Sequence, residues 1–280
     1  GDSLRGAIDG SVDRELLSAI TREAWADTIQ AAQQFYEPGV FTTLVGYEYT
    51  TSASDRGNLH RNVIFRGADK LPAMPFSRFH SRNPEDLWAW LDDLRAQGIE
   101  ALAIPHNMNG SNGQMFRLAD WAGDPMDDEY AAKRMRNEPL VEITQIKGTS
   151  ETHPLLSDAD EWADFEIMPF RIATRLYSEP RGSYVREALL NGLAFEDRGV
   201  ANPYRFGFVG ASDTHTAAIS TDESSFYGKI GLLDTRGDLR GSLPMSEADA
   251  RRAKDAGADN IKDIDGKTYR DGAPITWGAS

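Results

Sequence analysis

Histidine and carboxylate side chains lie in, or directly beside, four of the five hydrophobic segments that the sequence predicts to be β-strands. The residues concerned are Glu48, His60, His106, Asp213 and His215. Asp213 and His215 alternate at the end of a segment, so both side chains can point the same way and bind one ion. Imidazole and carboxylate ligands without a thiol favour zinc, manganese or iron over calcium. We therefore predict a divalent-metal site built from these residues.

Each of these residues, taken alone, has a simpler interpretation. A histidine that follows a hydrophobic strand is more commonly a hydrogen-bonded, half-buried side chain than a metal ligand. Glu48 could equally face solvent or form an ion pair. The occurrence of such residues at four strand segments together is what favours a metal site.

Strands and helices alternate along the sequence. The predicted strands are 41–50, 59–65, 101–105, 140–146 and 206–211. Hydrophobic residues at helical spacing predict a helix around Trp25, Asn83 before Pro84 predicts the start of another, and a third is predicted to end near Gly192. The segment 107–137 is expected to be an irregular excursion with local helix. Because the strands are almost continuously hydrophobic, we expect a parallel α/β arrangement whose strand ends meet at one face.

Composition and charge narrow the functional classes. The chain has 280 residues, no cysteine and a formal net charge of −14. The absence of cysteine excludes disulfides, thiolate zinc sites and a cysteine nucleophile. The acidic excess disfavours binding to nucleic acid or to anionic membrane surfaces, and no hydrophobic run is long enough for a transmembrane helix. We therefore expect neither a nucleic-acid nor a membrane partner, while the compartment, cytoplasmic or periplasmic, is left open.

Several short motifs resemble those of the domain of unknown function 3604 family. The motifs are Val45–Tyr49, Gly57–Asn62, Ile104–Asn107, Glu142–Ile143 with Gly148–Pro154, and Gly210–His215. That family is similar to the polymerase and histidinol phosphatase (PHP) superfamily of metal-dependent phosphoesterases. The resemblance extends from about Trp25 to about Ala217. It implies an α/β fold, a partial distorted (β/α)7 TIM-like barrel of PHP type with long loop excursions.

The resemblance also implies a ligand set for up to three divalent metal ions. Glu48 matches a glutamate that bridges two ions, and the other four predicted ligands match residues that complete the coordination. The His-x-His and Asp-His motifs that open the superfamily pattern have no counterpart here, since the first histidine is His60. We therefore expect the chain to be an interior part of a longer protein, lacking about two strands of the barrel.

The expected activity is that of a metal-dependent hydrolase, most simply a phosphoesterase, with Glu48, His106, Asp213 and His215 at the catalytic centre. Four further residues are candidates for contacting a small anionic substrate. They are Arg61, Asn107, Lys147 and His153. The loop around His153 could instead cap the helix that follows. Hydrolysis of an amide or a sulfate ester is an alternative activity, and metal or glycan binding without catalysis is another.

The charge distribution suggests a division of the chain. We expect a PHP-like hydrolase domain over residues 1–240 and a polar appendage over residues 241–280, where large hydrophobic side chains are few. An incomplete barrel would expose hydrophobic strand edges, which pair readily with other strands. A homodimer of this chain is therefore expected.

Overall fold

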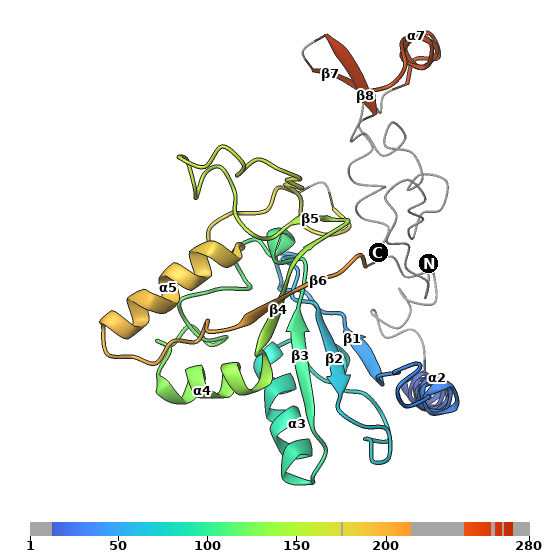
Figure 1. Ribbon diagram of the computed structural model, residues 1–280, viewed down its shortest axis with the longest axis vertical. Helices are drawn as coiled ribbons and strands as arrows, with labels where there is room; N and C mark the ends of the chain where they lie inside the picture. Colours follow the sequence, from blue (N-terminus) through green and yellow to red (C-terminus); the bar gives the residue numbers. More distant parts are fainter. Residues whose placement is uncertain (1–12, 175, 214–243, 259–260, 265, 271–280) are drawn as a thin grey trace.

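The computed structural model describes residues 13–174, 176–213, 244–258, 261–264 and 266–270. Three small sheets are formed within this part of the chain (Figure 1). The first contains β1 (Gly46–Tyr49), β2 (Arg61–Phe65) and β3 (Ala101–Pro105). The second has the order β5 (Gly148–Thr149), β4 (Leu140–Gln145) and β6 (Gly207–Gly210). The third pairs β7 (Ile261–Ile264) with β8 (Lys267–Arg270).

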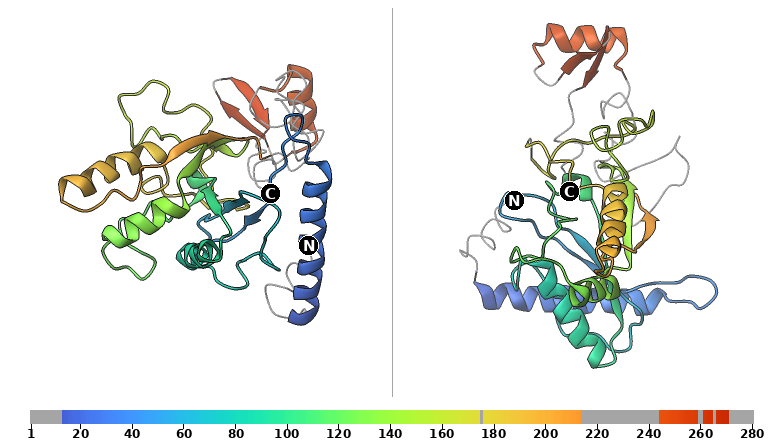
Figure 2. Two further views of the ribbon diagram at one scale, coloured as in Figure 1. Left: turned by 60° about the horizontal axis from the view of Figure 1, so that its bottom comes forward. Right: turned by 90° about the vertical axis from the view of Figure 1, so that its left-hand side faces the viewer.

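The helices accompany these sheets. They are α2 (Arg14–Phe35), α3 (Pro84–Ala96), the short 3-10 helix η1 (Met108–Gly110), α4 (Asp128–Asn137), α5 (Val185–Asp197) and α7 (Glu247–Asp255). The first and fourth long helices, α2 and α5, lie on opposite sides of the sheets (Figure 2). Among the described residues, no helix is both long and hydrophobic enough to cross a membrane.

The prediction of a parallel (β/α)7 TIM-like barrel is wrong, because no barrel closes within the described residues and the first sheet is antiparallel throughout. The link between β1 and β2 contains no helix and folds back on itself through the antiparallel bridge between Ser52 and Asn58, so it forms a hairpin and not a crossover between parallel strands. The only parallel pair of strands in the described chain is β4 with β6. β4 also lies beside β3, so the two three-stranded sheets are neighbours.

Among the described residues, two hydrophobic cores hold the first two sheets and helices α2 to α5 together. In the first core, the buried side of α3 packs with Val63 and Phe65 of β2, and Trp25 of α2 contacts the same core. The indole Nε1 of Trp25 donates a hydrogen bond of 2.9 Å to the carbonyl oxygen of Pro72. The second core surrounds Phe116 and Tyr204 and includes Val185 of α5. The predicted strands 59–65 and 101–105 therefore supply buried faces as expected, although in an antiparallel sheet.

The predicted start of α3 at Asn83 and Pro84 is confirmed. The Asn83 side-chain oxygen accepts a 2.9 Å hydrogen bond from the backbone N–H of Glu85, and Pro84 occupies the first turn. Gly98 follows the helix with φ of +80°, a conformation that glycine adopts without a steric penalty. Local chemistry alone thus fixes both ends of this helix.

Removing the cap should weaken the fold by a modest and measurable amount. We expect Asn83→Ala to lower the free energy of unfolding by about 1 kcal/mol, because one N–H of the first turn loses its acceptor. Urea denaturation followed by circular dichroism measures the change. Asn83→Asp keeps an acceptor at this position and should retain most of the stability. Equal stability of the wild type and the alanine variant would contradict a capping role.

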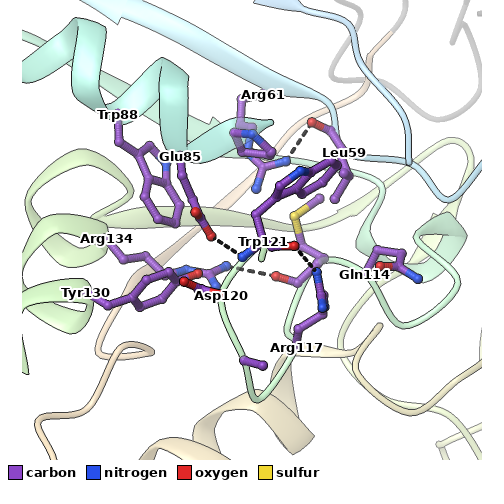
Figure 3. A pocket seen from close by; sticks show the side chains of 13 residues that line it. Leu59, Arg61, Glu85, Trp88, Gln114, Arg117, Asp120, Trp121, Tyr130 and Arg134 are labelled. Atoms are coloured by element: carbon purple, nitrogen blue, oxygen red, sulfur yellow. Dashed lines mark hydrogen bonds between the residues drawn. The ribbon is translucent and has the colours of Figure 1, made fainter. Parts of the chain in front are cut away.

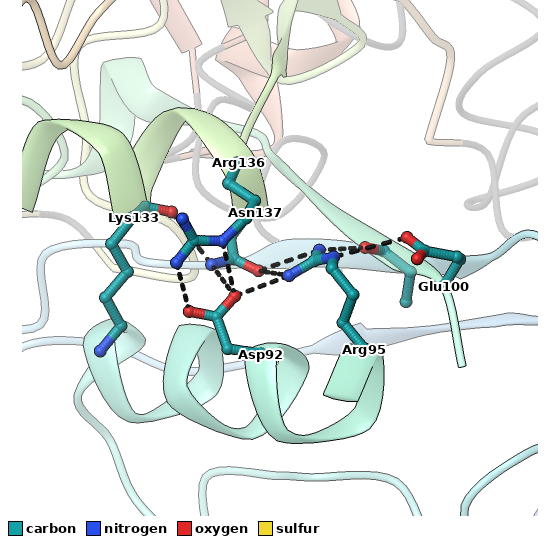
Figure 4. Close-up of polar contacts among 7 residues, drawn as sticks. Asp92, Arg95, Glu100, Lys133, Arg136 and Asn137 are labelled. Atoms are coloured by element: carbon teal, nitrogen blue, oxygen red, sulfur yellow. Dashed lines mark hydrogen bonds and ion pairs between the residues drawn. The ribbon is translucent and has the colours of Figure 1, made fainter. Parts of the chain in front are cut away.

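A polar cluster joins α3 to α4 (Figure 4). Asp92 of α3 accepts hydrogen bonds of 2.6 and 3.0 Å from the Arg136 guanidinium and one of 3.1 Å from the amide of Asn137. Hydrogen bonding by Arg136 is the main reason why the pKa of Asp92 lies below its usual value. The same contacts hold α4 against α3, and α4 in turn carries residues of a buried network described below.

One other sequence expectation needs correction. The third predicted helix does not end near Gly192, because α5 continues to Asp197. A Cβ on Gly192 would lie 2.1 Å from the side-chain oxygen of Asn202, so glycine serves close packing here rather than helix termination. The polar appendage contains regular structure, α7 and the β7–β8 hairpin, and the backbone N–H of Met245 donates to the carbonyl oxygen of Thr268.

Candidate metal centre

Glu48, His60 and His106 come together at one end of the first sheet. The Nδ1 atom of His60 lies 2.7 Å from Oε1 of Glu48, and Nε2 of His106 lies 3.5 Å from the same oxygen. The two imidazole rings meet edge to face with their centroids 5.6 Å apart. One potential ligand atom from each residue lies within 4.8 Å of the others. Three of the five predicted ligands are therefore neighbours in space.

The antiparallel order of the first sheet explains this meeting. His106 directly follows the last residue of β3, Glu48 lies near the end of β1, and His60 directly precedes β2. In a three-stranded antiparallel sheet, the last residues of the two outer strands and the first residues of the central strand lie at the same end of the sheet. The backbone N–H of His106 donates to the carbonyl oxygen of His60 at 3.2 Å, which aligns the two histidines. The expectation that parallel strand ends unite these residues is therefore wrong for this sheet.

The protonation states of the cluster suit cation binding. Burial raises the pKa of Glu48, but hydrogen bonds with His106 and His60 outweigh burial and hold this pKa well below its usual value. Burial lowers the pKa of His60 despite the neighbouring Glu48 carboxylate. At neutral pH the cluster thus combines a carboxylate with a neutral imidazole at His60. These are the forms of the two side chains that bind metal ions.

The surroundings also fit a divalent cation. His106 is 3% exposed, and its Nδ1 atom is buried with no hydrogen-bond partner among the described residues. One carboxylate oxygen of Glu142, a residue that is also 3% exposed, is buried without such a partner. Nitrogen and oxygen donors without a thiolate match zinc, manganese or iron. Three protein ligands leave a coordination position open, as catalytic sites of this kind require.

Glu142 is a residue of this region that the sequence analysis did not assign to the site. It lies in the middle of β4, and its charge interacts with those of His106, Lys147 and Glu48. Burial raises the pKa of Glu142 above its usual value, and nearby His106 and Lys147 counteract only part of this rise. A carboxylate between the hydrophobic residues Val141 and Ile143 of a strand was the signal available in the sequence, because such a side chain is rarely buried without a function.

Glu142 should reduce the stability of the metal-free protein at neutral pH. A folded-state pKa above the unfolded value of about 4.5 means that the folded protein binds the proton more tightly, so stability falls as pH rises through this window. We expect Glu142→Gln to have a higher Tm than the wild type at pH 7 in a chelator, and an equal Tm at pH 4. Thermal denaturation at both values measures this. Glu129→Gln, a change at an exposed position of α4, should alter neither Tm, and a lower Tm of Glu142→Gln at pH 7 would contradict the assignment.

Asp213 lies apart from the three-residue cluster and is paired with Lys147. The Lys147 ammonium forms a close ion pair with the Asp213 carboxylate, and the side chain of Gln145 donates a 3.0 Å hydrogen bond to it. Lys147 is almost fully buried, and its positive charge contributes to the lowered pKa of His60. The ends of the parallel strands β4 and β6 bring these groups together. The predicted ligand His215 lies outside the described residues.

Arg61 points away from the cluster, although it follows His60 directly. Its Nε donates a 2.8 Å hydrogen bond to Glu138, and Nη1 donates to the carbonyl oxygen of Leu59 at 2.6 Å. Figure 3 shows Arg61 among the residues of a small pocket that also contains Trp88 and Arg134. Successive side chains of a strand point to opposite faces, which separates these two neighbours. The structure therefore does not bring Arg61 to the predicted substrate position.

The other two predicted substrate contacts occupy different environments. Asn107 follows His106 with φ of +51°, and both polar atoms of its buried side chain are without a hydrogen-bond partner among the described residues. Asn58 donates hydrogen bonds to the carbonyl oxygens of His106 and Asn107, which fixes this turn. His153 accepts a hydrogen bond from the backbone N–H of Leu155, and its ring packs on Tyr184. His153 thus stabilises its own loop, whereas Asn107 lies beside the cluster.

The comparisons with known proteins bear on the family. No curated protein matches the chain, and no solved structure matches it. The pattern of a family described as "Protein of unknown function (DUF3604)" matches residues 5–273, a longer stretch than the motifs alone indicated. Because the match covers almost the whole sequence, the chain belongs to the DUF3604 family.

Proposed function

We propose that this protein is a metal-dependent hydrolase that acts on a phosphoester or a similar small anionic ester. The observation that carries the proposal is the convergence of Glu48, His60 and His106, whose potential ligand atoms lie within 4.8 Å of one another. The resemblance of the surrounding motifs to the PHP superfamily of metal-dependent phosphoesterases supports the same activity. The raised pKa of Glu142 and the lowered pKa of His60 add to this support, because groups with shifted pKa values are typical of reactive sites.

Each residue of the cluster has a role in the proposal. Glu48, His60 and His106 would hold a divalent cation, and the Glu48 carboxylate would offset part of its charge. When bound, such a cation polarises the ester and lowers the pKa of a coordinated water toward neutrality. The Nδ1 atom of His60 is oriented by its 2.7 Å contact with Glu48, so the imidazole keeps one orientation. Ordered ligands of this kind reduce the reorganisation needed at the reacting centre.

Lys147 supplies positive charge for the substrate. Its ammonium is held in place by Asp213 and lies close enough to His60 to influence the pKa of that imidazole. In a protein with a net charge of −14, an anionic ester needs such local positive charge in order to approach. We propose that Lys147 offsets negative charge on the non-reacting oxygens of the ester.

Metal analysis combined with an ester assay tests the proposal. Purified protein is stripped with a chelator, reconstituted with zinc, manganese or iron, analysed for bound metal, and assayed with bis-p-nitrophenyl phosphate. We expect at least one tightly bound ion per chain and turnover that depends on it. The variant His80→Ala, which changes a histidine outside the cluster, should behave like the wild type. Absence of both bound metal and metal-stimulated turnover would overturn the proposal.

A further inference from the structure

The loop after β5 forms a hollow that the proposed metal centre does not use. Its volume is about 250 Å³, and its lining residues are Thr149, Glu151, Thr152, Trp162, Ala163 and Phe165. We call it the aromatic hollow. All of its lining residues except Thr149 lie in the chain between β5 and α5, which Figure 1 draws as long loops.

Two large aromatic side chains of the hollow are displayed to solvent. Trp162 is 71% exposed and Phe165 is 62% exposed, although both lie in a loop whose backbone is hydrogen-bonded in place. The N–H of Phe165 donates to the carbonyl oxygen of Trp162, and the N–H of Thr149 donates to that of Glu166. Exposed aromatic rings on an ordered loop are typical of a binding surface. The hollow therefore offers two exposed aromatic side chains to a ligand.

The charge of the surrounding loop selects the ligand class. The segment 157–166 contains five acidic residues and no basic residue. Arg186 of α5 pairs with Glu151 and with Asp160, and these are the ion pairs of this loop among the described residues. Glu161 and Asp164, on either side of Trp162, are exposed and form no ion pair within the described chain. The potential of the hollow is therefore negative, which disfavours an anionic ligand.

Binding sites that combine aromatic rings with negatively charged side chains recognise organic cations. The electron-rich face of an indole attracts an ammonium group, and nearby carboxylates add a longer-range attraction. We propose that the aromatic hollow binds an alkylammonium group and that the substrate of this protein carries such a group beside its anionic ester. The second part of this inference rests on the proposed hydrolase function, whereas the first does not.

The position of the hollow relative to Lys147 connects it to the metal centre. β5, which supplies Thr149 to the hollow, begins directly after Lys147. Asn109 fixes this connection, because its amide donates hydrogen bonds of 3.0 Å to the carbonyl oxygen of Lys147 and 3.3 Å to that of Met168. Under this proposal, the anionic part of a zwitterionic phosphoester of an amino alcohol binds toward Lys147 and its cationic part binds at Trp162 in the hollow.

Binding of choline to the metal-free full chain tests the first part. Isothermal titration calorimetry measures the affinity for choline and for dimethylbutanol. Dimethylbutanol is the neutral isostere of choline, in which carbon replaces the charged nitrogen. We expect choline to bind and the isostere to bind at least about fivefold more weakly. Trp162→Ala should weaken choline binding by about fivefold or more, whereas Trp121→Ala, which removes an indole elsewhere on the surface, should leave it unchanged. Equal binding of both compounds, or no effect of Trp162→Ala, would overturn the site.

A second variant tests the charge argument. The double change Glu161→Gln with Asp164→Asn should weaken choline binding most at low ionic strength and leave the isostere unaffected, because only the cation senses these carboxylates. Equal loss for both compounds would show that the variant disturbs the loop, and would contradict the electrostatic role.

Hydrolysis of p-nitrophenyl phosphorylcholine tests the second part. We expect a KM at least about fivefold below that for bis-p-nitrophenyl phosphate, and we expect Trp162→Ala to remove this difference. Choline binding without hydrolysis of either ester would leave the hollow intact and overturn the hydrolase proposal. Hydrolysis of both esters with equal KM would overturn the assignment of the hollow to the substrate.

Discussion

Replacing Glu48 by glutamine is expected to abolish metal binding and to reduce ester hydrolysis by about 10³-fold or more. Glu48 contributes the only carboxylate of the three-residue cluster, and both imidazoles contact the same oxygen atom. The amide of glutamine keeps the size of the side chain but removes the charge that offsets a bound cation. A Lewis-acid contribution of several kcal/mol corresponds to such a factor, since each tenfold change in rate equals about 1.4 kcal/mol.

The stability of the same variant provides a second measurement. The pKa of Glu48 in the folded protein lies below its unfolded value of about 4.5, so the carboxylate stabilises the metal-free fold above that pH and loses this effect on acidification. We therefore expect Glu48→Gln to lower the Tm at pH 7 and to reduce the fall in Tm between pH 5 and pH 3. Thermal denaturation in a chelator measures both.

A matched control distinguishes the loss of a carboxylate in the cluster from the loss of a carboxylate elsewhere on the same sheet. Glu100 precedes β3 at the other end of the first sheet, and its half-exposed side chain contacts Arg95 at 3.4 Å. Glu100→Gln should retain metal binding, turnover and Tm. If Glu48→Gln bound metal as tightly as Glu100→Gln, the cluster would not be the metal centre, whatever the activity of the protein.

Local signals in the sequence predicted those elements whose cause is local. Asn83, Pro84 and Gly98 determine the ends of α3 through capping and backbone conformation, and these act within a few residues. The strand 101–105 was likewise predicted at its observed bounds. Pairing direction depends instead on which strands meet, and a continuously hydrophobic strand is compatible with either direction. The parallel barrel was therefore inferred from a pattern that does not determine topology.

The candidate site shows the same limit at the level of single residues. Three of the residues predicted as ligands are neighbours in the structure, although in a different strand arrangement, because all three lie at strand ends on the same side of the sheet. The orientations of Arg61 and Glu142 could not be predicted in this way. Other parts of the protein cover both faces of β2 and β4 in part. The alternation of hydrophobic and polar residues along these strands therefore does not reveal which side chains face the cluster.

Truncating Glu138 to alanine is expected to destabilise the protein by about 3–5 kcal/mol, the largest effect on stability that we predict. Glu138 is 1% exposed, and its Oε1 atom accepts hydrogen bonds of 2.8 Å from both Arg61 and the indole N–H of Trp88. Its other oxygen lies 3.5 Å from the guanidinium of Arg134. Two buried guanidinium groups therefore depend on this one carboxylate for charge compensation.

The geometry around Arg134 makes relaxation difficult. Its guanidinium lies over the rings of Trp88 and Tyr204, at 5.6 and 4.9 Å from their centroids, and it donates a 2.9 Å hydrogen bond to the carbonyl oxygen of Met115. These contacts hold the charged group inside the core and do not allow it to reach water. Arg61 is held in the same way by the carbonyl oxygen of Leu59. An unpaired buried charge costs more than the loss of the ion pair itself.

Urea denaturation of Glu138→Ala and of a surface control compares the loss of a carboxylate from a buried ion pair with the loss of one from an exposed ion pair. Glu196 pairs with Arg205, whose side chain is 70% exposed, and Glu196→Ala should cost less than about 1 kcal/mol because water replaces the lost partner. A loss of stability below about 1 kcal/mol for Glu138→Ala as well would mean that Arg61 and Arg134 reach solvent when the carboxylate is absent.

Because Arg61 directly follows His60, the buried network also fixes the start of β2. Glu138→Ala should therefore weaken metal binding without changing any residue that touches the cluster.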